Sequence, residues 1–195
     1  MEAARQHRLF PLFYLAAAFG LRRGEVLGLT WPDIDLEKGE LHIRRALVKD
    51  LASNKPILTG TKTPTSNRTI PLTEEAIAIL EEHRQRLIDD GLYQPNGLVF
   101  PSLSGTPIRP ENLKRAWKSI LNKAGVKYAR LHDLRGTFLT RVIRQTGNPK
   151  LAAALAGHKT LSTTLKHYTH ISQEELKSTL RSLQVLPKDK DPEDN

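Results

Sequence analysis

The sequence predicts an α+β fold that is mainly helical, with a small antiparallel sheet in its N-terminal half. Apolar residues recur at helical spacing near both ends of the chain. Between about residues 40 and 72, β-branched residues replace this spacing and favour strands. With 195 residues, of which 38% are hydrophobic, the chain is long enough for one well-packed domain.

The first third of the chain should contain two helices and then strands. Residues 6–19 predict a helix that ends at Gly20, with an apolar face formed by Leu9, Leu12, Phe13, Ala16 and Ala17. The stretch RGEVLGL predicts a second, short helix. ELHIRRALV (residues 40–48) and NRTIPL (residues 67–72) predict antiparallel strands, which the turn-rich TGTKTPTSN (residues 59–67) would connect.

The middle of the chain predicts two longer amphipathic helices. Thr73 is a suitable N-cap for a helix that has acidic residues in its first turn and continues to about Asp90. A loop should follow. Pro110 can open the next helix, since the first turn does not use the N–H that proline lacks, and Gly125 can close it.

Short helices should dominate the C-terminal half. We expect them at residues 132–146, 149–156 and 160–168, separated by Gly147 and Gly157. Ser172 and Glu175 form a capping-box pair in front of a last amphipathic helix. We expect one domain over residues 1–186, followed by a disordered acidic tail at residues 187–195.

The formal net charge is +9, and much of this excess lies between residues 109 and 130, where Glu111 is the only acid. A polyphosphate partner such as nucleic acid explains such a field, and charge that serves only solubility is the alternative. The sequence has no cysteine, which excludes disulfides and thiolate metal sites. No apolar run is long enough for a membrane span, so we expect a soluble, cytoplasmic protein without a membrane partner.

Several histidines surround a tyrosine in GHKTLSTTLKHYTHIS, at positions His158, His167, Tyr168 and His170. The cluster resembles a metal site at first, but no cysteine or carboxylate stands close by, and no zinc pattern is present. The best carboxylate pair, Asp33 and Asp35, is explained more simply by the turn that enters the first strand. The sequence therefore does not predict a metal site.

Arginines can bind the charge of a phosphodiester when no metal does so, because each presents a planar and permanently charged fork. Arg22 lies at a helix start, where Glu25 could orient it. His132 and Arg135 are three residues apart and share one helix face. We expect that face to be free for chemistry, because the opposite one is apolar and carries Leu131, Leu134, Phe138 and Val142.

Each of these residues also has a structural interpretation. Arg22 could belong to a solvated helix start, and His132 and Arg135 could form a surface pair. Lys62, in a TKT turn, would ordinarily be a loop lysine. Tyr168 continues an apolar helical spacing and would ordinarily be a core residue. What favours the chemical interpretation is that all of them occur together, in one order along the chain.

Four stretches, GLRRGEVLGLTWPDID, TKTPTSNRTIPL, HDLRGTF and AGHKTLSTTLKHYTH, closely resemble successive motifs of the catalytic domain of tyrosine recombinases, the phage integrase family. The resemblance runs from about Leu9 to Leu183. Many relatives carry His at the position of Gly136 and Leu at that of Ala156, so packing details are expected to differ. The resemblance implies the fold of that domain and six catalytic residues, Arg22, Lys62, His132, Arg135, His158 and Tyr168.

The resemblance implies a role for each of the six. The two arginines would bind the phosphate, and Tyr168 would attack it to form a 3′-phosphotyrosyl link. His132 would accept the tyrosine proton, and Lys62, in a β-hairpin turn, would protonate the departing 5′-oxygen to give a 5′-hydroxyl. His158 would hydrogen-bond the phosphate or the developing transition state. This chemistry requires no metal, cofactor or ATP.

The implied partner is double-stranded DNA, whose strands would be exchanged and religated at a specific site. Exchange requires several protomers, and the apolar face of Leu176, Leu180 and Leu183 could join them into a tetramer on DNA. Packing of that face on its own domain explains it equally well. Full-length relatives usually carry an N-terminal DNA-binding domain, whereas this sequence starts directly in the catalytic part, as an excised piece or as a truncated remnant.

Two other functions stay open at this point. A non-catalytic DNA-binding remnant would bind through the basic patch in a salt-dependent way and form no covalent adduct. Relaxation of supercoils, as by type IB topoisomerases, would use the same cleavage chemistry without exchange between duplexes.

Overall fold

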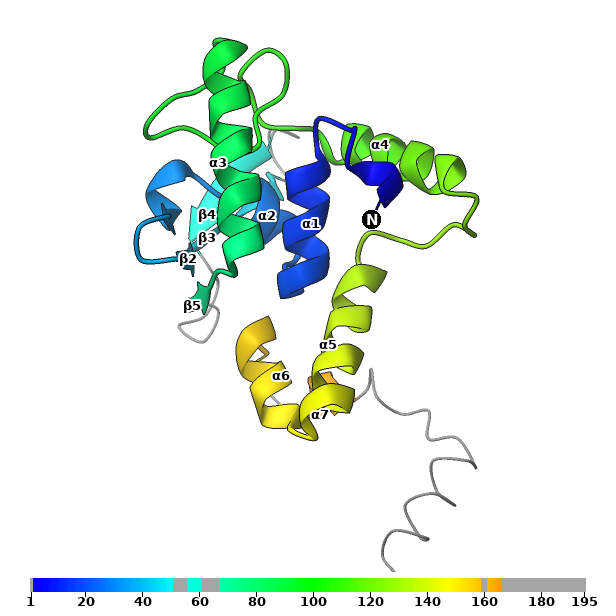
Figure 1. Ribbon diagram of the computed structural model, residues 1–195. Coiled ribbons are helices and arrows are strands. Elements are labelled where there is room, and N and C mark those ends of the chain that lie inside the picture. The colour runs from blue at the N-terminus through cyan, green and yellow to red at the C-terminus, as the bar shows by residue number, and fades with distance from the viewer. Residues whose placement is uncertain (1, 51–55, 61–66, 159–160, 166–195) are drawn as a thin grey trace, which may run out of the picture.

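The computed structural model describes residues 2–50, 56–60, 67–158 and 161–165 (Figure 1). Lys62, Tyr168, the helix expected after Ser172 and the acidic tail lie outside the described residues. The fold is α+β and mainly helical, with its strands in the N-terminal half, as the sequence predicts. Each helix in the described part of the chain is too short or too polar to cross a membrane.

The first helix, α1 (Phe10–Phe19), is shorter at its start than expected. The reason is Pro11, which is tolerated in the first turn but would break a helix that began at residue 6. The predicted end is confirmed, because Gly20 caps α1 with a left-handed φ of 62°. The short helix α2 (Arg23–Leu27) follows at once, as expected.

The strands in the described part of the chain form two sheets instead of the single one expected. A three-stranded antiparallel sheet has the order β1 (Ile34–Asp35), β2 (Glu40–Ile43), β5 (Arg68–Pro71). The second sheet is a pair of strands, β3 (Arg45–Lys49) and β4 (Pro56–Gly60). Residues 40–48 form strands as predicted, except at Arg44, where the chain leaves the first sheet and then pairs with β4.

The remaining helices lie close to their predicted positions. Thr73 caps α3 (Glu74–Asp89) by accepting a hydrogen bond from the main-chain N–H of Ala76 at 3.2 Å. Pro110 opens α4 (Pro110–Lys123), and Gly125 follows it with a φ of 65°. After these come α5 (Asp133–Thr146), α6 (Pro149–Ala156) and α7 (Leu161–Leu165).

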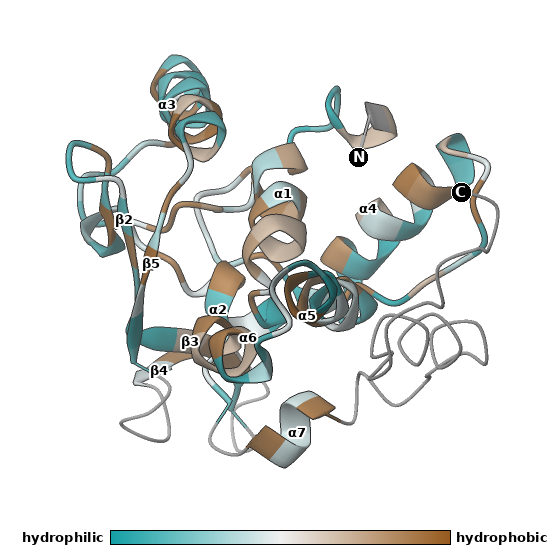
Figure 2. Cartoon of the chain, turned by 60° about the horizontal axis from the view of Figure 1, so that its bottom comes forward, coloured by the Kyte–Doolittle hydropathy of each residue, from teal (hydrophilic) through white to brown (hydrophobic). Residues whose placement is uncertain are grey.

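The apolar core has two parts. A large cluster joins α1, α2, strands β2, β3 and β5, α3 and α4, and Phe13, Leu80 and Phe100 are among its most buried side chains. A small cluster lies between α5 and α6, and consists of Phe138, Leu139, Ile143, Ala152 and Ala156. Figure 2 views the molecule from the end where α5, α6 and α7 lie. We call these three helices the C-terminal unit and the remainder the main body.

Candidate active site

Arg22 and Glu25 form the first part of the site, at the start of α2. The main-chain N–H of Arg22 donates to Glu25 Oε2 at 2.9 Å, and Arg22 Nη1 donates to Glu25 Oε1 at 2.6 Å. Glu25 is only 3% exposed. The glutamate therefore holds both the backbone and the guanidinium of Arg22, as the sequence predicts.

Arg135 is buried, which corrects the expectation that its helix face is free. Its Nη1 donates to the carbonyl of Gly20 at 2.6 Å, and its Nη2 donates to that of Ala156 at 2.7 Å. Both carbonyls lie at helix C-termini, where main-chain acceptors lack partners within the helix and the helix dipole is negative. The guanidinium thus joins the ends of α1 and α6 to α5.

Burial, together with the positive charges of Arg22 and Arg68, lowers the pKa of Arg135 to about 10, although the negative charge of Glu25 opposes this shift. This value is still well above 7, so Arg135 carries its charge at neutral pH. A charged guanidinium in a buried place is suited to an anionic ligand, since few water molecules compete with it there.

The two arginines converge at the end of α6. Arg22 Nη1 lies 3.5 Å from the Ala156 carbonyl to which Arg135 donates, and Arg22 Nη2 donates to the carbonyl of Gly157 at 3.1 Å. Arg22 and Arg135 are more than a hundred positions apart in the sequence, so only the fold brings them together.

Arg68, at the start of β5, belongs to the same cluster and was missed by the sequence analysis. Its Nη2 and Nη1 contact Glu25 Oε2 and Oε1 at 2.9 and 3.2 Å, and its Nε donates to the carbonyl of Leu155 at 2.8 Å. In the sequence Arg68 stands in a β-branched strand, which indicates secondary structure only. Its presence in one of the four family-like stretches was the one available signal.

The pKa of Glu25 reflects this cluster. Burial alone would raise it, but the hydrogen bonds and charge of Arg68, followed by those of Arg22, outweigh burial and leave the pKa below its ordinary value. Arg22 and Arg68 thus contact one carboxylate, whose negative charge also acts on Arg135, so three guanidiniums share a single acidic group. The cluster has an excess of positive charge that favours an anion such as phosphate.

The two predicted histidines lie beside the arginines. His158 follows Gly157 directly, and its Nδ1 lies 2.8 Å from the hydroxyl of Thr164, a fully buried residue of α7. His132 is the N-cap residue of α5. It lines a cleft of about 660 Å³ together with Arg22, Lys114 and Arg130. Lys62 and Tyr168 lie outside the described residues.

Asp33 and Asp35, the carboxylate pair weighed as a metal site, serve local structure. Asp33 accepts hydrogen bonds from the N–H and the hydroxyl of Thr30 at 3.0 and 2.8 Å, and it pairs with Arg45 at 3.2 Å. Asp35 pairs with Lys38 at 3.1 Å.

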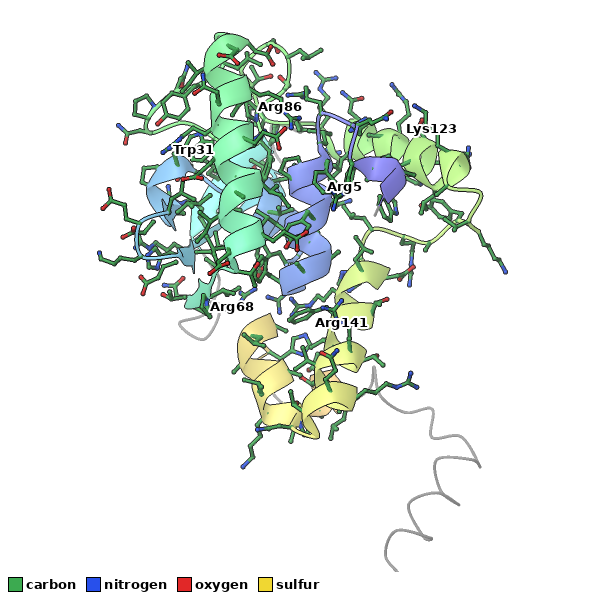
Figure 3. The ribbon with its side chains drawn as sticks, viewed as in Figure 1. Arg5, Trp31, Arg68, Arg86, Lys123 and Arg141 are labelled. Carbon is green, nitrogen blue, oxygen red and sulfur yellow. The ribbon has the colours of Figure 1, made fainter. Side chains whose placement is uncertain are left out.

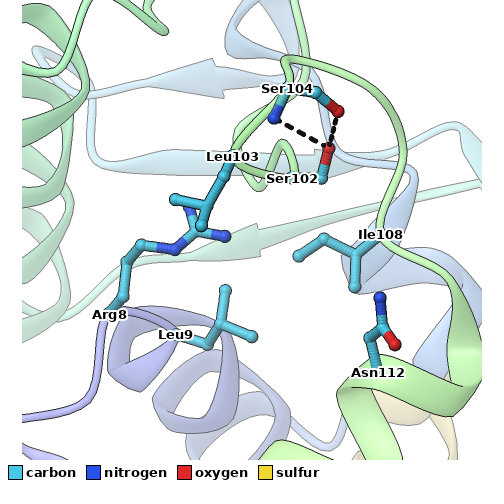
Figure 4. A pocket seen from close by; sticks show the side chains of 7 residues that line it. All are labelled: Arg8, Leu9, Ser102, Leu103, Ser104, Ile108 and Asn112. Atoms are coloured by element: carbon cyan, nitrogen blue, oxygen red, sulfur yellow. Dashed lines mark hydrogen bonds between the residues drawn. The ribbon is translucent and has the colours of Figure 1, made fainter.

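A second cavity, of about 480 Å³, lies between the start of α1 and the loop before α4 (Figure 4). Its described lining is mostly uncharged, apart from Arg8, and Ser102 and Ser104 hydrogen-bond each other there. None of the four predicted catalytic residues that the structure describes lines it. The arginine cluster is therefore the stronger candidate for the active site.

Comparison with known proteins decides the family. Residues 2–175 match the pattern that defines the phage integrase family. The chain belongs to this family. A tyrosine recombinase XerC-like protein from Caldanaerobacter subterraneus subsp. tengcongensis is 36% identical over 200 residues, which cover 95% of this chain and 51% of that protein. The tyrosine recombinase XerD of Proteus mirabilis is 33% identical and is covered over 46% of its length. The chain thus spans about half the length of these curated relatives.

Solved structures of the phage integrase family share the fold. The XerA recombinase is 25% identical, with a TM-score of 0.70 over 93% of this chain and 59% of the other. The Tn1549 transposon integrase, solved in complex with a circular intermediate DNA, is 22% identical, with a TM-score of 0.72 over 92% of this chain and 60% of the other. The fold is that of the tyrosine recombinase catalytic domain, as the four family-like stretches imply.

Proposed function

We propose that residues 1–186 form the catalytic domain of a site-specific DNA recombinase that cleaves and rejoins strands through Tyr168. The observation that carries the proposal is the convergence of Arg22 and Arg135 at the end of α6, next to His158. Membership of the phage integrase family supports it.

The arginine cluster would bind the scissile phosphate. A guanidinium has five N–H donors, and the two carbonyl contacts of Arg135 engage its two terminal nitrogens with one N–H each. Donors remain that can face a ligand. Arg22 and Arg135 would stabilise the charge that grows on the non-bridging oxygens, and loss of one such donor typically costs about 10²- to 10³-fold in rate.

The reaction would proceed by direct displacement at phosphorus. The phenolic oxygen of Tyr168 forms a bond to phosphorus while the bond from phosphorus to the 5′-oxygen breaks. His132 accepts the tyrosine proton, Lys62 donates a proton to the departing 5′-oxygen, and His158 hydrogen-bonds the phosphate. The 3′-phosphotyrosyl link keeps the phosphodiester energy, so a 5′-hydroxyl from a partner duplex can reverse the step without ATP, metal or another cofactor.

Double-stranded DNA would be the partner. The cleft that holds Arg22 and His132 is also lined by Arg23, Lys114 and Arg130, and no acidic side chain is among its described lining residues. The Tn1549 integrase, a structural neighbour, is seen bound to DNA. We further propose that protomers associate into a tetramer on DNA through the segment of Leu176, Leu180 and Leu183, and that the protein works in the cytoplasm.

Covalent capture of DNA tests the proposed function. The chain and its Tyr168→Phe variant are expressed in cells, purified under denaturing conditions, and the DNA that stays attached is sequenced. We expect attached DNA from the wild type alone, enriched in one sequence. DNA in neither sample would refute the recombinase and favour the non-catalytic remnant. Adducts spread over all sequences would favour supercoil relaxation.

A further inference from the structure

We propose that Arg68 is a positioning residue of the active site: it fixes Glu25, and through Glu25 the catalytic Arg22, against the end of α6. The inference rests on the proposed function of the arginine cluster and adds a residue to it. Figure 3 shows Arg68 at the edge of the main body that faces α6. Three features of its surroundings support the assignment.

The first feature is the way Arg68 and Arg22 share one carboxylate. Glu25 Oε1 receives Nη1 of Arg22 at 2.6 Å and Nη1 of Arg68 at 3.2 Å. Glu25 Oε2 receives the main-chain N–H of Arg22 and Nη2 of Arg68, both at 2.9 Å. Arg68 therefore grips the glutamate with both ends of its fork. The carboxylate can rotate only if this two-point contact breaks.

The second feature is burial. The side chain of Arg68 is 8% exposed and that of Glu25 is 4% exposed, whereas that of Arg22 is 38% exposed. The buried Arg68–Glu25 pair is thus the fixed part of the cluster. Arg22 reaches from this pair toward the cleft. A ligand-binding side chain is held best when the residues behind it are themselves locked by packing and hydrogen bonds.

The third feature is the turn after α6, which is built closely around Arg68. Gly157 has a φ of 65°, and a Cβ placed there would lie 2.7 Å from Nη1 and 3.2 Å from Cδ of Arg68. Arg68 also donates to the Leu155 carbonyl at 2.8 Å. The same guanidinium thus sets the place of the α6 terminus that receives Arg22 and that precedes His158.

The test measures binding and cleavage separately. Arg68→Met keeps much of the side-chain length but removes the charge and the donors, and Arg68→Lys keeps the charge without the fork. The probe is a nicked duplex of the sequence recovered by covalent capture. We expect Arg68→Met to slow single-turnover adduct formation by about 10²-fold, because Arg22 would no longer be held in place. Loss of a phosphate-binding donor has an effect of this size. We expect its DNA dissociation constant to change by less than about threefold. Arg68→Lys should recover part of the rate.

Arg45→Met is the matched control, because Arg45 also pairs with a buried carboxylate, Asp33, but lies outside the cluster. Its adduct rate should stay within about twofold of the wild type, since surface and structural changes away from the site act on stability only. Thermal unfolding of each variant sets a temperature at which all are folded. If Arg68→Met does not fold, the comparison is made with Arg68→Lys.

A double-mutant cycle decides whether Arg68 acts through Glu25. Glu25→Gln with Arg68→Met should be no slower than the slower single variant, because each removes the same contact. The inference would be overturned if the rate loss of the double variant equalled the product of the two single losses. It would also be overturned if an Arg68 variant were as fast as the wild type. A wild type that forms no adduct would instead refute the proposed function, so the two failures are distinguishable.

Discussion

The contacts inside the main body differ in kind from the contacts that join the main body to the C-terminal unit. Inside the main body, apolar side chains such as Phe13, Leu12 and Phe100 pack against each other with almost no exposure. Between the two regions, Phe138 packs against Gly20, and arginine side chains reach helix-end carbonyls. The side chains that we propose to bind phosphate therefore also join the two regions.

This difference predicts how stability and activity are related in each region. A change in the apolar core should remove folded protein without altering the chemistry of what remains folded. A change in the arginine cluster should lower both the stability of the fold and the rate of adduct formation. Four predictions follow this contrast, ordered by the expected loss in free energy of unfolding.

Phe13→Ala should have the largest effect on stability. Phe13 is fully buried in the large cluster and packs on Trp117, with ring centroids 5.1 Å apart. Truncation of such a residue costs about 3–5 kcal/mol, which urea unfolding would measure. The adduct rate per folded molecule should be unchanged. The exposed Leu103→Ala serves as the control and should shift stability by less than about 0.5 kcal/mol.

Gly20→Ala should separate the two regions. Gly20 has a φ of 62°, and a Cβ there would lie 2.3 Å from the ring of Phe138 on α5. The left-handed strain and the displaced ring together should cost about 2–4 kcal/mol in thermal unfolding. Gly91→Ala is a matched control, because its φ is 67° but no atom lies within 4 Å of the added Cβ. Equal losses for both variants would contradict the role of the Phe138 contact.

Arg135→Lys should cost less stability and far more activity. An ammonium cannot span the carbonyls of Gly20 and Ala156, so one buried acceptor loses its donor, at about 1–3 kcal/mol. Adduct formation should fall by about 10²-fold or more while DNA is still bound. Arg144→Lys, an exposed position on the same helix, should change neither. An Arg135→Lys protein that cleaves like the wild type would remove Arg135 from the proposed mechanism.

Mild acid should produce the smallest effect, and it should act on the main body first. His83 is 2% exposed; burial lowers its pKa below the ordinary 6.5, although its contact with the Val99 carbonyl opposes this shift. The unfolded chain therefore binds a proton more readily than the folded one. The stability that depends on neutral His83 is complete above pH 6.5 and is lost as pH falls through the lower folded pKa.

Glu25 in the arginine cluster should also make the protein less stable as the pH falls, but over a lower pH range than His83. Its pKa lies below the ordinary 4.5, so its contribution is complete above pH 4.5 and is lost only as pH falls further. Urea midpoints measured from pH 7 to pH 3 should show both ranges. His83→Leu should abolish the loss of stability in the upper pH range and leave the loss in the lower pH range unchanged. A wild type whose stability is constant between pH 7 and pH 5 would contradict the assignment to His83.

Local sequence signals were sufficient for most helices. Caps such as Thr73, Pro110 and Gly125 act on neighbouring backbone groups, so they can be identified without knowledge of the fold. Strand β4 was missed because most of its side chains are at least partly exposed and do not alternate in burial. The β-structure of residues 40–48 was predicted, but its division between two sheets was not, because composition does not reveal which partner each half pairs with.

The candidate active-site residues were predicted from the resemblance to the family, but the contacts that these residues make could not be predicted from the sequence. Apolar patterns assign a charged residue to the open face of a helix, which gave the wrong environment for Arg135. What buries Arg135 is a pair of carbonyls from α1 and α6, which no periodicity within α5 can indicate. Arg68 escaped notice because its partners Glu25 and Leu155 lie 43 and 87 positions away.

The end of α6 has a consequence for insertions and deletions. Successive main-chain carbonyls at residues 155, 156 and 157 each receive a guanidinium from a different part of the chain. Adding or removing one residue within α6 would turn these carbonyls by about 100° and shift them by about 1.5 Å along the helix axis. All three arginines would lose their acceptors in a single event. The eight-residue length of α6 is thus a fixed spacer, and variation in length should be confined to the segments that leave this turn undisturbed.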